Sequence, residues 1–178
     1  MSDLTASEVV IIEDESNLSL SFVIAGDPPV QQRPRMNCKK AVKKVPIYYD
    51  PSSLKKKGWK KSVVKALVDY GVKSFPLFKE KHTDIMQSDG LFIDVIFYVR
   101  RRRTDYRSKK GILYLKDVVQ KYPGKKDTDN MLKFVMDALH EVLYDDDKCI
   151  VKICASKEFV DEAEKEKGGY TSLRITSL

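Results

Sequence analysis

The sequence predicts one α+β domain, in which a small mixed β-sheet packs against helices. Apolar residues alternate with polar ones over residues 18–24, which is the period of a strand with one buried face. A β-branched and aromatic run over 91–99 predicts a second strand. Apolar positions at helical spacing over 130–143 predict a helix. With 178 residues and 42% hydrophobic content, the chain can bury one core of this kind.

The remaining elements follow from local signals. A helix is expected after Pro51-Ser52 and before Gly71, with apolar positions at Leu54, Val63, Val64, Leu67 and Val68. The helix over 130–143 has Thr128 or Asp129 as its expected N-cap. Residues 104–125 are expected to be an insert or a short helix, from the positions of Leu113, Leu115, Val118 and Val119. Further strands are predicted over 150–157 and 170–176.

Composition excludes several classes of protein. No apolar run approaches the roughly 18 to 20 residues of a membrane helix, and the first residues lack a secretory pattern. Three cysteines without paired metal-ligand spacing support neither a disulfide framework nor a zinc module. We therefore expect a soluble intracellular protein with no membrane partner, nuclear if the source is eukaryotic and otherwise cytoplasmic.

The charge of the chain is unevenly distributed. The formal net charge is +7, yet residues 1–17 contain five acidic and no basic residues. The other 161 residues thus contain 33 basic and 21 acidic residues, a net charge of +12. A domain this basic attracts polyanions, of which nucleic acid is the commonest inside cells.

Residues 1–17 are predicted to form an acidic, flexible tail ahead of the domain at 18–178. Within the tail, Val9, Val10, Ile11 and Ile12 are followed directly by the acidic run Glu13-Asp14-Glu15. An apolar quartet with an acidic flank resembles a SUMO-interaction motif, which would add as a strand to a SUMO partner. The alternative is that these four residues form an edge strand or an apolar patch of this domain.

Clustered carboxylates are the most informative residues of this basic domain. Asp127 and Asp129 precede a predicted helix, Asp137 lies within it, and 145–147 is an aspartate triplet after it. Such groups repel one another unless a divalent cation lies between them, and Mg²⁺ prefers oxygen ligands. Whether Asp147 returns to Asp127 and Asp129 depends on the order of the strands. A helix cap and a solvated turn are the alternative explanation.

A lysine lies on the same predicted helix face as two of these aspartates. Asp129, Lys133 and Asp137 are four residues apart, so Lys133 would stand over a metal site at Asp129. An ammonium group there can stabilise negative charge in phosphoryl transfer. The alternative is a surface ladder of ion pairs, each contributing a few tenths of a kcal/mol.

The same segment resembles the signature of the RusA-type Holliday junction resolvases, which are crossover junction endodeoxyribonucleases. The resemblance is carried by the order and spacing of Lys126-Asp127-Thr128-Asp129-Asn130-Met131-Leu132-Lys133, Asp137-Ala138-Leu139, Tyr144, Asp146-Asp147 and Ile150-Val151. Lys157 is placed like the strand lysine of that family, and residues 26–35 look like its N-terminal loop. The resemblance covers roughly residues 18–176.

The resemblance implies a homodimeric nuclease that nicks two opposed strands of a four-way DNA junction in recombination and repair. It assigns Asp127, Asp129 and Asp147 of one subunit as catalytic ligands of Mg²⁺, with Mn²⁺ as a substitute. Lys133 is the implied catalytic lysine. Asn130 is expected to support the site by orienting Asp129, and Asp146 by supporting Asp147. The insert over 104–125 departs from the family pattern.

The expected DNA contacts are basic residues near these motifs. They are Arg33, Arg35, Arg100, Arg101, Arg102, Arg103, Lys125, Lys126 and Lys157. Two other functions remain open from the sequence. One is a non-catalytic, structure-specific nucleic-acid-binding or adaptor protein, and the other is a nuclease acting on flaps or forks.

Overall fold

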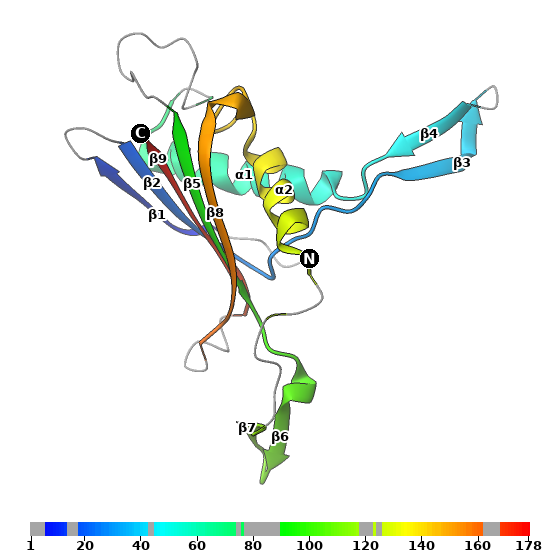
Figure 1. Cartoon of the computed structure of the whole chain (residues 1–178), viewed down its shortest axis with the longest axis vertical. Helices are drawn as coiled ribbons and strands as arrows, with labels where there is room; N and C mark the ends of the chain where they lie inside the picture. The colour runs from blue at the N-terminus through cyan, green and yellow to red at the C-terminus, as the bar shows by residue number, and fades with distance from the viewer. Residues whose placement is uncertain are drawn as a thin grey trace.

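The computed structural model describes residues 6–13, 18–42, 45–73, 76, 90–117, 123, 126–161 and 168–178. Its centre is a five-stranded sheet of order β1-β2-β9-β5-β8 (Figure 1). The strands are β1 (Ala6–Glu13), β2 (Leu18–Ala25), β9 (Tyr170–Ser177), β5 (Leu91–Val99) and β8 (Ile150–Phe159). Neighbouring strands are antiparallel except β5 and β8, which are parallel. The predicted α+β fold with a mixed sheet is therefore confirmed.

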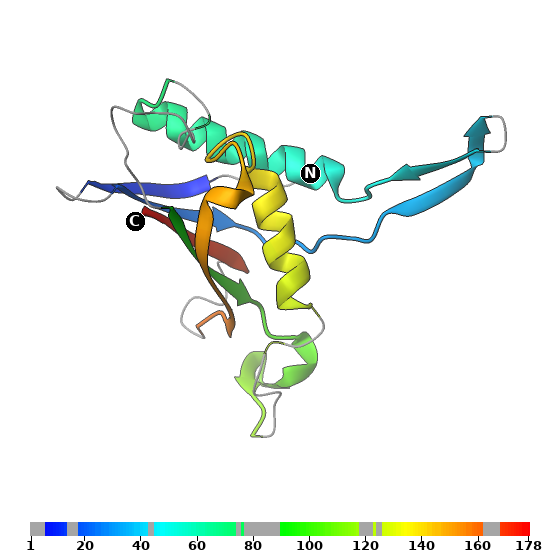
Figure 2. The ribbon, with the colours of Figure 1, turned by 45° about the horizontal axis from the view of Figure 1, so that its top comes forward.

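Two helices cover one face of this sheet, α1 (Ser53–Tyr70) and α2 (Thr128–Leu139) (Figure 2). Alternate residues of the central strands are buried, as expected for a sheet with one covered face. The helices meet where the ring of Trp59 contacts that of Phe134 edge to face, with centroids 5.6 Å apart. The core thus lies between the sheet and the two helices.

Helix α1 occupies the predicted segment, with Ser52 as its N-cap and Gly71 as its left-handed C-cap. Its buried stripe is narrower than predicted. Trp59, Val63 and Leu67 are buried at intervals of four residues, whereas Leu54 and Val68 are 80% and 52% exposed. No helix within the described ranges is long and apolar enough to cross a membrane.

Helix α2 begins and ends earlier than its apolar pattern suggests. Its N-cap is Asp127, not Thr128 or Asp129, and its last residue is Leu139. The chain leaves the helix through Glu141, whose φ is +67°, and the Glu141 N–H donates to the carbonyl of Tyr144 at 2.8 Å. Val142 and Leu143 remain buried in the turn, so they fit a helical pattern without being helical.

Two β-hairpins project from the body as separate arms (Figure 1). The first pairs β3 (Arg35–Val42) with β4 (Val45–Tyr49), and sequence reasoning did not predict it. The second pairs β6 (Tyr106–Lys109) with β7 (Ile112–Leu115), after the short 3₁₀ helix η1 (Arg103–Asp105).

The hairpin at 106–115 shows that a short helix in this part of the insert was the wrong expectation. Its two-residue turn, Lys110-Gly111, has φ of +53° and +79°. Positive φ at both positions is the type I′ geometry that suits a tight hairpin, and glycine adopts it readily. Val118 and Val119 lie outside the described residues.

The backbone of 6–13 forms an edge strand of the sheet. β1 pairs antiparallel with β2 along its length, with an irregularity between Ala6 and Glu8. This is the alternative that the sequence left open beside a SUMO-interaction motif. The side chains of Val9, Val10, Ile11 and Ile12 lie outside the described part of the structure.

Candidate functional site

The start of α2 presents two carboxylates to solvent. Asp127 is the extended residue before the first turn, Asp129 lies within that turn, and both are exposed. The Asp127 carboxylate accepts a hydrogen bond from the Asn130 side-chain amide at 3.3 Å and makes no backbone capping bond. Asn130 was expected to orient Asp129, but its side-chain amide instead contacts Asp127. The free N–H groups of this helix end favour negative charge nearby.

Two lysines and one loop hold this helix end in place. The Lys157 ammonium on β8 donates to the Lys126 carbonyl at 2.6 Å, and the Lys126 ammonium donates to the Pro28 carbonyl at 2.6 Å. The Gln31 N–H donates to the Asn130 carbonyl at 3.0 Å. Burial lowers the pKa of Lys126 despite the nearby Asp27 carboxylate. Two of the three lysines predicted to contact DNA, Lys126 and Lys157, thus position the backbone around Asp127.

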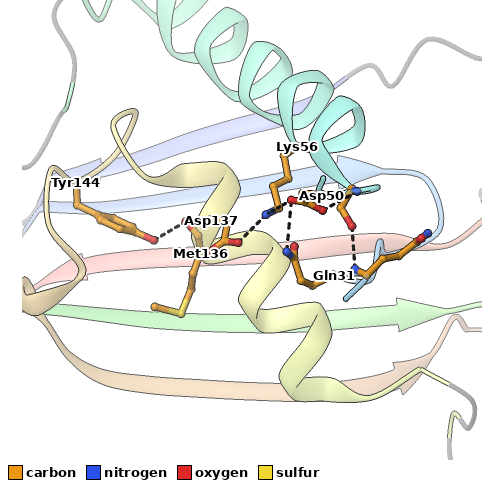
Figure 3. A network of polar contacts seen from close by, with 8 residues as sticks. Gln31, Asp50, Lys56, Met136, Asp137 and Tyr144 are labelled. Atoms are coloured by element: carbon orange, nitrogen blue, oxygen red, sulfur yellow. Dashed lines mark hydrogen bonds and ion pairs between the residues drawn. The ribbon is translucent and has the colours of Figure 1, made fainter. Parts of the chain in front are cut away.

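Lys133 lies one turn beyond Asp129, and its side chain is exposed. Asp137, the next residue on this face, accepts from the Lys56 ammonium at 2.6 Å instead of serving a metal site (Figure 3). Lys56 also donates to Asp50 at 2.9 Å, and Asp50 accepts from Gln31 at 3.5 Å. This network ties α1 to α2.

The network shifts the pKa values of Lys56 and Asp50. Burial lowers the pKa of Lys56, but the hydrogen bonds to Asp137 and Asp50 outweigh it, so the pKa is raised. Burial likewise raises the pKa of Asp50, and the bonds from Lys56 and the Ser52 N–H outweigh it, so that pKa is lowered. Both shifts favour the charged forms, and the ion pair persists across the neutral range.

Asp147 lies at the opposite end of α2 from Asp127 and Asp129. The chain leaves the C-terminal end of α2, turns through residues 140–146, and enters β8, which runs back toward Lys126. The 12 residues of α2 span about 18 Å. A single chain therefore keeps Asp147 apart from the acidic pair, contrary to the expectation that one subunit supplies all three.

Local contacts fix the turn that presents Asp147. The Tyr144 hydroxyl donates to the Met136 carbonyl at 2.8 Å (Figure 3). The Asp146 carboxylate accepts from the Lys148 N–H at 3.0 Å and thereby caps the 3₁₀ helix η2 (Asp147–Cys149). That bond also lowers the pKa of Asp146. Asp146 thus supports Asp147, which is exposed. Across the ranges that the structure describes, no three acidic, histidine or cysteine side chains are grouped to hold a metal.

The other cations predicted to contact DNA divide into two groups. Arg100 donates two hydrogen bonds of 3.0 Å to Asp27, and Arg101 lies 3.8 Å over the Phe159 ring. The hydrogen bond from Arg100 holds the pKa of Asp27 below its ordinary value. Arg33, Arg35, Arg102 and Arg103 form the second group and are exposed to solvent, as Arg100 also is. Lys125 lies outside the described residues.

Sequence reasoning missed the contacts that organise the site. Arg100 and Asp27 are 73 residues apart, and Lys56 and Asp137 are 81 apart. At such sequence separations no local pattern predicts that the two residues are in contact. The only local signal was that Arg100 directly follows a buried strand, while Asp27 lies in a Gly-Asp-Pro-Pro turn.

The fold and site together define a basic α+β domain that presents a carboxylate pair and a lysine at one helix terminus. Comparison with protein families gives this class a name. The endodeoxyribonuclease RusA family matches residues 25–166, which include both arms, both helices and β8. The chain therefore belongs to the RusA family of endodeoxyribonucleases, which are hydrolases. No curated protein matches the chain significantly.

Proposed function

We propose that this protein is a metal-dependent endodeoxyribonuclease that resolves four-way DNA junctions by paired nicks. The observation that carries the proposal is the exposed pair Asp127 and Asp129 at the start of α2, with Lys133 one turn further, in a member of the RusA family. Mg²⁺ suits this donor set because it binds one or two carboxylates and keeps several waters.

One chain supplies only part of the proposed ligand set, so a second chain would have to supply the third carboxylate. β8 is an outer strand of the sheet, and on its outer side no described strand pairs with it. Val151 and Ile153 on this strand are 59% and 43% exposed, and they lie two residues apart, so they share one face of the strand. An open strand edge with apolar side chains is suited to pairing with a second copy.

Antiparallel pairing of two β8 strands about a two-fold axis would complete the site. In such a pair, the beginning of one strand lies beside the end of the other. The end of β8 is where Lys157 contacts the Lys126 carbonyl, next to Asp127. Asp147 of the partner subunit would then approach Asp127 and Asp129. We propose this homodimer in place of a site built within one subunit.

The residues have separate roles in the proposed reaction. Asp127, Asp129 and Asp147 of the partner subunit would hold the metal, which when bound polarises water and stabilises charge on phosphate oxygens. Lys133 would bind the scissile phosphate and neutralise the charge that develops there. Asn130 keeps the Asp127 carboxylate in place. Two such sites related by a two-fold axis would give symmetric nicks, with 5′ phosphates on the products.

The proposal is tested with a labelled four-way junction and Mg²⁺. We expect the wild type to cut it, and Asp129→Asn to bind it without cutting, because the variant keeps the shape of the side chain but loses its charge. Asp69→Asn, an exposed change on α1, is the matched control and should cut normally. Undiminished cutting by Asp129→Asn would overturn the proposal.

The same assay separates the alternative functions. A non-catalytic nucleic-acid-binding or adaptor protein, which the charge of +12 would also suit, gives salt-sensitive binding that is indifferent to Mg²⁺ and yields no nicked product. A flap or fork nuclease cuts those substrates faster than a junction at equal concentration.

A SUMO partner is a separate proposal. β1 is the outer strand at the other edge of the sheet, and on one side it pairs with β2. Its other side could receive a strand of SUMO. We expect simultaneous Ile11→Ala and Ile12→Ala to abolish a SUMO pull-down and to leave DNA cutting intact. Failure of the wild type to bind SUMO would remove this proposal.

A further inference from the structure

The β6–β7 arm is closed at its base by hydrogen bonds between the two chain segments that lead into it and out of it. At its base, the Lys116 N–H donates to the Asp105 carbonyl at 2.9 Å, and the Lys116 ammonium donates to the Thr104 carbonyl at 2.7 Å. The arm begins after Arg100, whose partner Asp27 also interacts with Lys126, the residue before Asp127. The arm is therefore anchored at the sheet end where α2 starts (Figure 1).

One face of the arm combines apolar and basic side chains. The strand register sets Arg107 opposite Tyr114 and Lys109 opposite Ile112, so these four share a face. Together with Ser108 and Lys110, they line a hollow of about 590 Å³. Tyr114 is 46% and Ile112 57% exposed, so this face presents an aromatic and an aliphatic side chain to solvent.

The charge of the arm indicates the chemistry of its ligand. Residues 103–117 contain five basic residues and two acidic ones. Arg107 is 3.8 Å from Asp117, and both members of this pair are largely exposed. Exposed aromatic and apolar groups between cations can bind a flat apolar ring that carries negative charge at its edges. A nucleotide base with its flanking phosphates has this form.

We propose that the β6–β7 arm binds the branch point of DNA, with an unstacked base in the hollow beside Tyr114 and Ile112 and the adjacent phosphates on Lys109 and Lys110. In an intact duplex the base faces are covered by their neighbours, whereas a branch point offers unstacked bases. The arm thus distinguishes branched from linear DNA. This inference rests on the proposed function and specifies which part of the substrate the insert recognises.

The test measures binding, without cutting, in buffer that contains no divalent cation. A four-way junction carries the fluorescent base 2-aminopurine at its centre, and a linear duplex of the same arm sequence is the comparison. We expect Tyr114→Ala to bind the junction about tenfold more weakly, because it loses one stacked base, and to lose the fluorescence change. Its affinity for the linear duplex should stay within about twofold of that of the wild type.

A matched control lies on the same strand. Leu113 is also 46% exposed, but it pairs with Ser108 on the opposite face of the arm. Leu113→Ala should keep the junction affinity and the fluorescence change, and Tyr114→Phe should keep both because the ring remains. The double variant Lys109→Gln, Lys110→Gln should lose about two phosphate contacts. The slope of log K for junction binding against log salt concentration should therefore become shallower by about two.

Each other outcome overturns the inference. Wild-type junction affinity in Tyr114→Ala would show that the ring contacts no base, and equal losses on junction and duplex would show that the arm does not read branches. If Tyr114→Ala has a lower mass than the wild type in analytical ultracentrifugation, this face binds a second copy of the chain and not DNA. Binding is measured independently of cutting, so a wild type that binds junctions selectively but never nicks them would contradict the proposed function and leave this inference standing.

Discussion

Basic side chains around the start of α2 serve two purposes. Lys126, Lys157 and Arg100 direct their charged ends to a backbone carbonyl or a carboxylate of the same chain. Lys133 instead extends into solvent beside the acidic pair. The first group holds the helix end in position, and the second is available to a phosphate. Substitutions in the two groups should therefore have different effects.

Lys157→Met tests the positioning role. The change keeps much of the aliphatic stem but removes the hydrogen bond to the Lys126 carbonyl. Because the bond involves a charged donor, we expect the free energy of unfolding in urea to fall by about 1.5 to 3 kcal/mol. Lys61→Met, at an exposed position of α1, should change it by less than about 0.5 kcal/mol. Equal effects of the two variants would contradict the positioning role.

Asp50→Asn tests the network between the helices through its pH dependence. The pKa of Asp50 lies below its ordinary value of 3.8, so the charged form stabilises the fold above that pH. This contribution is lost as the pH falls through the lower folded value. The free energy of unfolding should therefore differ most between wild type and variant at neutral pH, and the difference should shrink below pH 3.8. A constant difference over an acid titration would contradict the role of the charge.

Elements of the fold were predictable where their pattern is local. The strands at 18–25, 91–99, 150–159 and 170–177 follow alternation or β-branched runs, and α1 has its cap signals at both ends. The arm at 106–115 was missed because its apolar residues were read as helical while the Lys110-Gly111 turn signal was overlooked. Asp127 and Asp129 could be placed together from sequence because they are neighbours in the chain.

The position of Asp147 could not be predicted in this way. It depends on two non-local facts, the length of α2 and the edge position of β8. Neither the aspartate run at 145–147 nor the apolar pattern of the helix shows how far Asp147 lies from Asp127 and Asp129. Buried Val142 and Leu143 even suggested a longer helix than the one that forms.

Two glycines provide a test at the level of elements, because their substitution by alanine should have opposite effects. A Cβ at buried Gly169 would lie 2.6 Å from an Asp27 carboxylate oxygen and 3.0 Å from the Tyr98 carbonyl. We expect Gly169→Ala to lower the free energy of unfolding by about 1 to 3 kcal/mol. A Cβ at Gly58 in α1 meets nothing within 4 Å, so Gly58→Ala should raise it by about 0.5 to 1 kcal/mol. Thermal denaturation checks both signs, and a stabilised Gly169→Ala would contradict the close approach.

The molecule as a whole has an open sheet edge at β8 and two arms that extend from the body (Figure 1). The edge and the first turn of α2 lie near each other, since Lys157 joins them. A second chain bound along β8 would thus be next to Asp127.

Subunit mixing tests this arrangement. Asp129→Asn and Asp147→Asn should each be inactive, because each lacks a ligand in both sites of its homodimer. When the two are mixed and allowed to exchange, a heterodimer has one complete site if Asp147 acts on the partner. We expect about a quarter of the wild-type number of sites, and single nicks in place of paired ones. If each chain holds its own metal, the mixture will stay inactive.

The length of α2 has a consequence for when cutting can occur. If the carboxylates at its two ends belong to different active sites, a monomer has no complete set of metal ligands and cannot cut DNA. The nicking rate would rise with the square of the protein concentration at high dilution and become linear once pairs dominate. A nuclease built in this way would not cut DNA at low protein concentration, even without an inhibitor.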